Sequence, residues 1–202
     1  LTGFKYIAGV MGEKDGKEEF ICGGEESYGY LVGDYVRDKD GVISSVALAE
    51  VAAWSRNQGK GMFGLLMDIY LKYGYFHEEL LSLTYKGLQG KQQISDMMAR
   101  LRNTPPASLG GSAVVELRDY DAGLIRNLST GGESPTGLPK SNVLQFHLAD
   151  GSVVTGRPSG TEPKIKFYFS LRAEMNDSSF YPGLRDGMTS RIRDIRRDLG
   201  VQ

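Results

Sequence analysis

Apolar and polar side chains alternate without a break near the C-terminal end of the chain, between residues 165 and 171. The apolar positions are Ile165, Phe167, Phe169 and Leu171. A period of two residues is typical of a β-strand with one face buried and one face polar. Such a strand needs neighbouring strands and a layer that covers its apolar face. This segment therefore predicts a sheet packed against other elements, rather than a helical bundle.

The surrounding residues supply candidates for those neighbours. Segments 143–148 and 152–155 form a predicted hairpin across the turn at 149–151, and 113–118 and 80–85 read as further strands. Segment 127–141 is a polar loop rich in Gly, Ser and Pro. Helical spacing of apolar residues predicts one helix around 94–101 and a long final helix over 180–199. We expect residues 75–202 to form an α+β domain, an antiparallel sheet with helices on one face.

The first third of the chain follows a different pattern. Segments 7–10 and 19–22 suggest short strands, and Asp40 is placed to cap a helix that follows it. A second helix over 62–73 should end at Gly74. Strand, loop, helix and helix in this order suggest the closing half of an α/β domain. The predicted domains are therefore residues 1–74, a partial α/β domain, and residues 75–202.

Composition limits the classes of partner. The 202 residues carry a formal net charge of −1, which provides no global field for nucleic acid or an anionic membrane. No run of about 18 apolar residues exists, which excludes a transmembrane helix. Cys22 is the only cysteine, so we expect a buried structural thiol, no internal disulfide and a cytoplasmic location. The chain starts without methionine, and we expect it to be a piece of a longer protein.

A loop suited to phosphate lies directly before the alternating strand. The residues that suit a phosphate dianion are Arg157, Ser159, Gly160, Thr161 and Lys164. They offer a guanidinium fork, two hydroxyls, an ammonium group and a glycine that leaves backbone N–H groups accessible. Prolines on both sides reduce the ordering that binding requires. The alternative is an ordinary hairpin connection with a solvated salt bridge, but the density of these groups favours a phosphate-binding loop.

A second loop, residues 24–29, places acidic and hydroxyl side chains between glycines. Glu25, Glu26 and Ser27 are candidates for binding sugar hydroxyls, although paired glutamates are also common on solvated turns. Lys39 precedes a helix; it either belongs to a set of surface ion pairs or reaches a phosphate and acts as an acid. His, Asp and Glu are nowhere spaced as metal ligands, so no metal site is predicted in this chain.

Both loops resemble motifs of one family. Residues 157–164, RPSGTEPK, resemble the fourth-domain phosphate-binding loop of the α-D-phosphohexomutases, the phosphoglucomutase/phosphomannomutase superfamily. Residues 24–29, GEESYG, are similar to the third-domain sugar-binding loop and stand upstream in the expected order. Residues 1–5 and 37–41 also resemble third-domain segments of the phosphoglucomutase-like and phosphopentomutase-like branch. The resemblance extends over essentially the whole chain.

The resemblance implies that residues 1–74 are the end of domain 3 and that 75–202 are domain 4, with a TATA-binding-protein-like fold. Family members interconvert sugar 1- and 6-phosphates through an active-site phosphoserine and a bisphosphate intermediate. A magnesium ion and a sugar 1,6-bisphosphate activator take part. By matching position, the residues at 25 to 27 would hold the sugar, Lys39 would contact substrate or assist proton transfer, and the 157–164 loop would hold the phosphate that is not transferred. The partners would be a phosphosugar and the N-terminal domains of the same polypeptide, with no nucleic acid and no membrane.

The chain also departs from the family pattern. Tyr28-Gly29 stands where phosphomannomutase-type members tend to carry Gly-His, which favours a phosphoglucomutase or phosphopentomutase. Neither the phosphoserine loop nor the aspartate-rich metal loop occurs in these residues, so we expect the isolated chain to be inactive. Magnesium would then be bound by the missing N-terminal part. Alternatives are a phosphopentomutase or sugar-bisphosphate synthase of the same superfamily, a non-catalytic sugar-phosphate-binding module, and, least favoured by the charge, a nucleic-acid-binding module.

Overall fold

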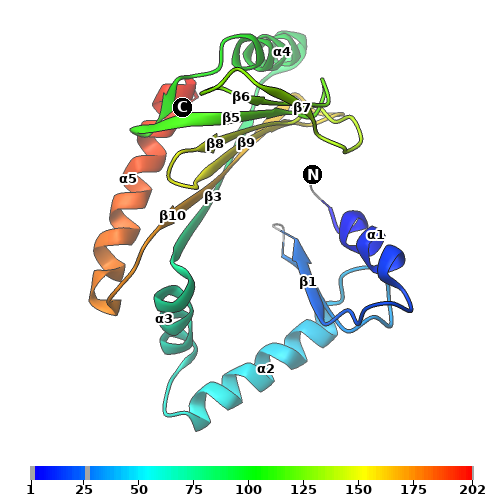
Figure 1. Cartoon of the computed structure of the whole chain (residues 1–202), viewed down its shortest axis with the longest axis vertical. Helices are drawn as coiled ribbons and strands as arrows, with labels where there is room; N and C mark the ends of the chain where they lie inside the picture. Colours follow the sequence, from blue (N-terminus) through cyan, green and yellow to red (C-terminus); the bar gives the residue numbers. More distant parts are fainter. Residues whose placement is uncertain (1–2, 26–27, 202) are drawn as a thin grey trace. The chain divides into compact units, whose positions relative to one another are not determined.

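A computed structural model describes residues 3–25 and 28–201, and its chain divides into two compact units, residues 1–68 and 69–202 (Figure 1). The division falls six residues before the predicted boundary at 74/75, inside helix α3 (Met62–Tyr73). The predicted stop of this helix is present: Gly74 follows it with φ +96°. A Cβ at Gly74 would lie 3.2 Å from the backbone oxygen of Ala173, so a side chain there would be both strained and crowded.

The first unit contains one hairpin and its helices. In order they are α1 (Lys5–Lys14), β1 (Cys22–Glu25), β2 (Gly29–Val32) and α2 (Gly41–Asn57), followed by the start of α3. Strands β1 and β2 pair antiparallel, with Cys22 opposite Val32 and Glu25 opposite Gly29. A small core of Phe4, Met11 and Leu31 holds α1 against the hairpin. The predicted cap is confirmed, because Asp40 Oδ1 accepts hydrogen bonds from the N–H groups of Val42 at 2.7 Å and Ile43 at 3.2 Å.

Two strand predictions in this unit are wrong. Residues 7–10 lie within α1, because Phe4, Ile7 and Met11 recur at helical spacing and together face the core. The expected strand at 19–22 starts at Cys22 instead, and its partner β2 was not predicted. Four apolar or small residues are too short a window to distinguish a helix from a strand by periodicity.

The second unit is built on an antiparallel sheet whose strands run in the order β3-β10-β9-β8-β5-β6-β7, with β4 paired to β5. The strands are β3 (Tyr75–Thr84), β4 (Ser108–Leu109), β5 (Ser112–Asp119), β6 (Leu124–Asn127), β7 (Glu133–Pro135), β8 (Leu144–Leu148), β9 (Val153–Pro158) and β10 (Lys164–Ala173). The helices are α4 (Gly87–Asn103), the short η1 (Ser178–Phe180) and α5 (Tyr181–Leu199). The α+β architecture predicted for this part of the chain is confirmed, and the segment expected to be a loop at 127–141 contains the short strand β7.

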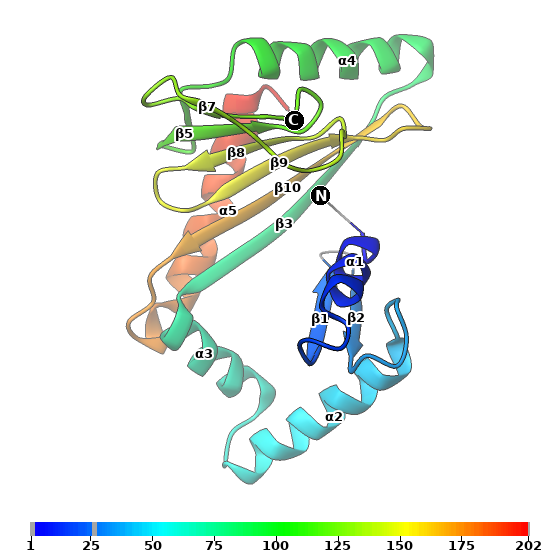
Figure 2. The ribbon, with the colours of Figure 1, turned by 45° about the vertical axis from the view of Figure 1, so that its right-hand side comes forward.

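The alternation in β10 separates a buried face from a polar one. Its four apolar side chains are completely buried, and α4 and α5 both pack against this strand (Figure 2). The helix residues that complete this core are Ile94, Met98 and Leu101 of α4 and Ile192, Ile195 and Leu199 of α5. Arg100 Nη2 donates to the Leu199 backbone oxygen at 2.6 Å and joins the two helices. The opposite face of β10 carries Lys166 and Tyr168, half-buried and away from the core.

Over residues 3–25 and 28–201, no helix combines the length and the apolar character needed to cross a bilayer.

Candidate functional site: a cationic hairpin loop and an acidic hairpin

The RPSGTEPK segment forms the connection between β9 and β10 and is held at both ends by the sheet. Pro158 pairs with Ile165 and Arg157 pairs with Lys166 in the antiparallel ladder. The Ser159 N–H donates to the Lys164 backbone oxygen at 2.7 Å, which extends the hairpin by one further bond. A strand pair of this kind fixes where the intervening residues lie.

The turn is ordered by its own hydroxyl group. Ser159 Oγ accepts hydrogen bonds from the N–H groups of Thr161 at 3.4 Å and Glu162 at 3.3 Å. These two N–H groups therefore converge on one oxygen atom, and both bonds are long enough for a stronger acceptor to replace them. A Cβ at Gly160 would meet no atom within 4 Å, so packing does not require glycine there. Its missing side chain instead leaves the N–H groups open to a ligand.

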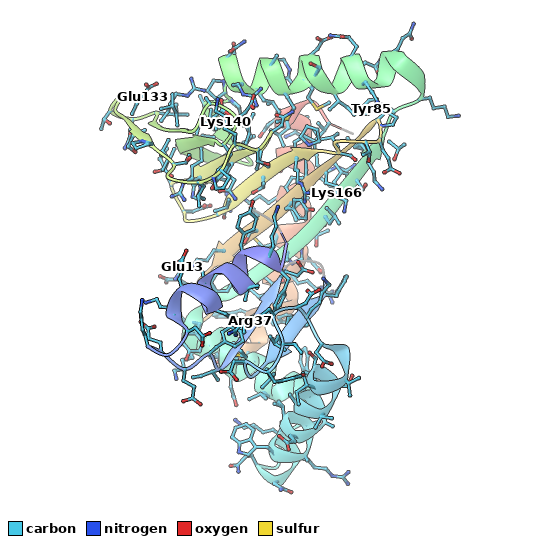
Figure 3. All side chains as sticks on the ribbon, turned by 90° about the vertical axis from the view of Figure 1, so that its right-hand side faces the viewer. Glu13, Arg37, Tyr85, Glu133, Lys140 and Lys166 are labelled. Carbon is cyan, nitrogen blue, oxygen red and sulfur yellow. The ribbon has the colours of Figure 1, made fainter. Side chains whose placement is uncertain are left out.

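These residues line a cavity of about 380 Å³, which we call the cradle. Its lining consists of Arg157, Pro158, Ser159, Gly160, Thr161, Glu162, Lys164 and Lys166. All the phosphate-loop residues predicted from the sequence lie in this lining. Lys166, labelled in Figure 3, was missed and assigned only to the polar side of its strand. The signal that identifies it is register: Lys166 is directly opposite Arg157, so both side chains leave the same face of the sheet.

Three cationic groups and one carboxylate thus border the same cavity. Within the part of the chain that the structure describes, no hydrogen bond or ion pair engages the side chains of Lys164, Lys166 or Glu162. The charges of the lining sum to an excess of positive charge, which suits an anion. The cradle is therefore chemically able to hold a phosphate dianion.

A second, smaller cavity of about 180 Å³ lies against the same loop, on the side of helix α4. Helix α4 contributes Lys91, Ile94 and Ser95, and the loop contributes residues that include Ser159 and Glu162. Glu162 consequently lines both cavities. The loop is fastened nearby by the Tyr85 N–H, which donates to the Pro163 oxygen at 2.8 Å.

The acidic loop lies in the first unit, at the tip of the β1–β2 hairpin. Glu25 closes β1 with its side chain only 12% exposed, and Lys39 Nζ lies 3.7 Å from its Oε1. A Cβ at Gly29 would come within 2.5 Å of Glu25 Oε1 and 2.6 Å of Lys39 Cδ. Glycine at position 29 is thus what lets these two predicted site residues meet. The other two, Glu26 and Ser27, lie outside the described residues.

Lys39 is held between two carboxylates. Asp38 Oδ1 lies 3.3 Å from its Nζ, and the hydrogen bond and charge of Asp38, together with the charge of Glu25, raise the pKa of Lys39. The Lys39 N–H in turn donates to Asp38 and lowers the pKa of that carboxyl group. Lys39 is therefore a stable cation at neutral pH, able to contact a phosphate, and the raised pKa makes release of its proton less favourable.

The remaining reactive side chains form no further site. The described parts of the chain contain no cluster of three or more His, Cys, Asp or Glu residues arranged to hold a metal ion. His77 Nδ1 shares a 2.7 Å hydrogen bond with the hydroxyl of Tyr75, and burial together with the charge of Arg118 lowers the pKa of His147. Cys22 is exposed, so the expected buried thiol is wrong; it begins β1 at the open edge of a two-stranded hairpin.

Comparison with known proteins points to one family. Residues 1–73 match the model of phosphoglucomutase/phosphomannomutase, alpha/beta/alpha domain III. The chain is 38% identical to a phosphoglucomutase of Staphylococcus epidermidis over 177 residues, which are 88% of this chain and 32% of that protein. A phosphoglucomutase of Staphylococcus haemolyticus is 37% identical over 175 residues, 86% of this chain and 32% of that protein. The chain spans about a third of the length of these relatives.

A solved structure has the same fold. The exocytosis-sensitive phosphoprotein pp63/parafusin from Paramecium, described as a phosphoglucomutase and solved in its open form, superposes with a TM-score of 0.58 at 17% identity. The match covers 98% of this chain and 34% of that protein. Because the sequence matches and the fold agree over almost the whole chain, this protein belongs to the phosphohexomutase superfamily, the phosphoglucomutases and phosphomannomutases.

Proposed function

We propose that this chain is the C-terminal part of a phosphohexomutase that interconverts sugar 1-phosphates and 6-phosphates. The cradle holds the phosphate that is not being transferred, and Glu25, Glu26, Ser27 and Lys39 bind the sugar. The observation that carries the proposal is that Arg157, Lys164 and Lys166, from two paired strands, line one cavity together with Ser159, Gly160 and Thr161 of the turn.

The division of roles follows from the chemistry of the reaction class. A mutase must accept the same sugar in two orientations, so one phosphate is gripped while the other reacts. A rigid cationic loop that grips the remote phosphate converts binding energy into correct placement of the reacting end. Ser159, Gly160 and Thr161 would present their hydroxyl and N–H donors to the phosphate oxygens, and Arg157 and Lys164 would neutralise the charge. A sugar 1,6-bisphosphate activator would bind in the same way, through either phosphate.

The sugar-binding side rests on Glu25 and Lys39. A carboxylate accepts hydrogen bonds from neighbouring sugar hydroxyls, and a lysine that stays protonated donates to a hydroxyl or a phosphate oxygen. The raised pKa of Lys39 keeps its ammonium group charged, which favours a role as a hydrogen-bonding contact to the substrate. We assign sugar selection between glucose, mannose and pentose phosphates to this acidic hairpin, with a phosphopentomutase or a sugar-bisphosphate synthase as the related alternatives.

Phosphoryl transfer itself is assigned to residues outside this chain. The described residues do not fit a magnesium site, and the sequence has no phosphoserine motif of the family. We therefore derive no metal-dependent or covalent step from this chain, and place both with the N-terminal domains of the same cytoplasmic polypeptide. The isolated chain would bind sugar phosphate weakly and have no mutase turnover; turnover by these 202 residues alone would contradict the proposal.

The test uses the full-length enzyme with glucose, mannose and ribose 1-phosphates. Arg157→Ala should raise KM for the preferred sugar phosphate by a factor of about 10 to 100, because a hydrogen bond to a charged group contributes about 1.5–3 kcal/mol. The matched control is Arg193→Ala, which removes the same charge from an exposed position on α5. Equal KM values in the wild type and Arg157→Ala would exclude the cradle as a substrate contact.

A further inference from the structure

The cradle contains a negative charge that opposes its ligand. Glu162 lines the cavity together with the cationic groups, and its carboxylate forms no ion pair with any of them in the described parts of the chain. A carboxylate beside a phosphate dianion repels it, and the repulsion reaches several ångströms in water. A loop selected only for tight phosphate binding would gain affinity by placing a neutral residue here.

The backbone of Glu162 is bonded at both its N–H and its carbonyl, which keeps the residue beside the cavity. Its N–H donates to Ser159 Oγ at 3.3 Å, and its carbonyl oxygen accepts from the Lys164 N–H at 2.8 Å. The carboxylate can therefore relocate only by rotation of its side chain. Because Glu162 also lines the cavity beside α4, rotation leads either toward the cradle or toward the side of the loop where Lys91 lies.

We propose that Glu162 is a built-in counter-charge of the cradle, which weakens its grip on a phosphate dianion and so allows the phosphate to leave. The inference rests on the proposed function, in which the cradle must hold one phosphate of a sugar and later accept the other. A site that binds both ends of the ligand in turn needs release as much as binding, since uniformly tighter binding of the ground state does not increase turnover. Glu162 is thus a specificity-determining residue that sets the affinity for the dianion.

The expected change in phosphate affinity follows from the Coulomb energy between the Glu162 carboxylate and a dianion bound in the cradle. For a separation on the order of 7 Å in water, removing one negative charge should tighten binding of a dianion about sevenfold at low salt and about twofold at 0.15 M ionic strength. The gain in phosphate affinity should decrease steadily as the salt concentration is raised. A purely structural role of Glu162 would not produce this salt dependence.

The experiment is an NMR titration of the 202-residue chain with inorganic phosphate at pH 8, where phosphate is mainly a dianion, at several salt concentrations. Glu162→Gln should bind phosphate more tightly than the wild type, and Glu162→Asp, which keeps the charge, should remain close to the wild type. The matched control is Glu174→Gln, which removes the same charge from an exposed residue just past the opposite end of β10. It should change the affinity by less than about 1.5-fold at 0.15 M salt.

Three results would overturn the inference, and they are distinguishable. If the wild type binds phosphate and Glu162→Gln binds no more tightly, the counter-charge role fails while the proposed cradle stands. If Glu162→Asp tightens binding as much as Glu162→Gln, side-chain size and not charge is responsible. If neither the wild type nor Glu162→Gln shows phosphate-dependent shifts in residues 157–166, both the inference and the proposed phosphate site are wrong.

Discussion

The two units of this chain differ in how completely they bury their own apolar surface. In the second unit the sheet side chains of β10 are fully buried beneath α4 and α5. In the first unit the described buried apolar side chains are Phe4, Met11, Leu31 and Met67, while apolar residues along α2 such as Val42 and Leu48 are exposed. The second unit therefore has an extensive buried core of its own. A two-stranded hairpin with helices is marginal by itself, and the first unit has apolar surface left to cover.

Part of the exposed apolar surface of the first unit forms a groove. An apolar groove runs between the β1–β2 hairpin and α2, lined by residues that include Leu31, Val32 and Leu48. The matching family model describes a three-layer α/β/α domain, and a domain of that kind covers both faces of its sheet. The phosphate cradle therefore stands on a sheet whose apolar side chains are buried, whereas the acidic hairpin stands beside an apolar groove that is exposed among the described residues.

The largest expected effect tests the complete core of the second unit. Phe167→Ala should lower the free energy of unfolding of that unit by about 3–5 kcal/mol, because it removes a fully buried aromatic ring of β10. Val42→Ala, at a side chain 77% exposed on α2, should change stability by less than about 0.5 kcal/mol. Urea denaturation of both variants measures this. Equal losses would show that α2 is covered within this chain and would remove the contrast between the units.

A smaller, pH-dependent change in the free energy of unfolding is expected only in the second unit. Burial, followed by the neighbouring Tyr181 and Tyr70 hydroxyls, raises the pKa of Tyr75 to about 12. The folded state holds this proton more tightly than the unfolded state, so the stabilisation is complete below about pH 10 and is lost as the pH rises from 10 to 12. We expect a loss of about 2–3 kcal/mol, measured as unfolding free energy against pH. In Tyr75→Phe this part of the alkaline loss should be absent; an unchanged profile would assign it to other groups.

The smallest effect on stability, and a selective one on binding, is expected at the acidic hairpin. Gly29→Ala would push aside the flexible side chains of Glu25 and Lys39, so the free energy of unfolding should change by about 0.5 kcal/mol or less. In the full-length enzyme the same change should raise KM for sugar phosphate several-fold, because the two side chains no longer meet. The control is Gly9→Ala, where a Cβ meets no atom within 4 Å. A KM unaffected by Gly29→Ala would separate this hairpin from substrate binding.

Local patterns were sufficient for the long elements of the second unit but not for its short strands β4, β6 and β7. The alternation around Phe167, the hairpin before it and the helical stripe ending at Leu199 each extend over enough residues for their period to be unambiguous. The Asp40 cap was also readable, because capping depends on residues only two or three positions away. Two predictions for the first unit were wrong. Residues 7–10 form part of a helix instead of a strand, and Cys22 is exposed instead of buried. Four residues define no period, and exposure depends on what else packs nearby.

The long strands and helices of the second unit, the composition of its phosphate loop and the resemblance to phosphohexomutases could be predicted from the sequence, because each depends on residues close together in the chain. The structure was needed to show that Lys166 lies opposite Arg157 beside the cradle, that Gly29 lets Glu25 reach Lys39, and that Glu162 borders two cavities. These relations depend on strand register and on the approach of separate elements. Sequence spacing alone carries no information about either until the strands are paired.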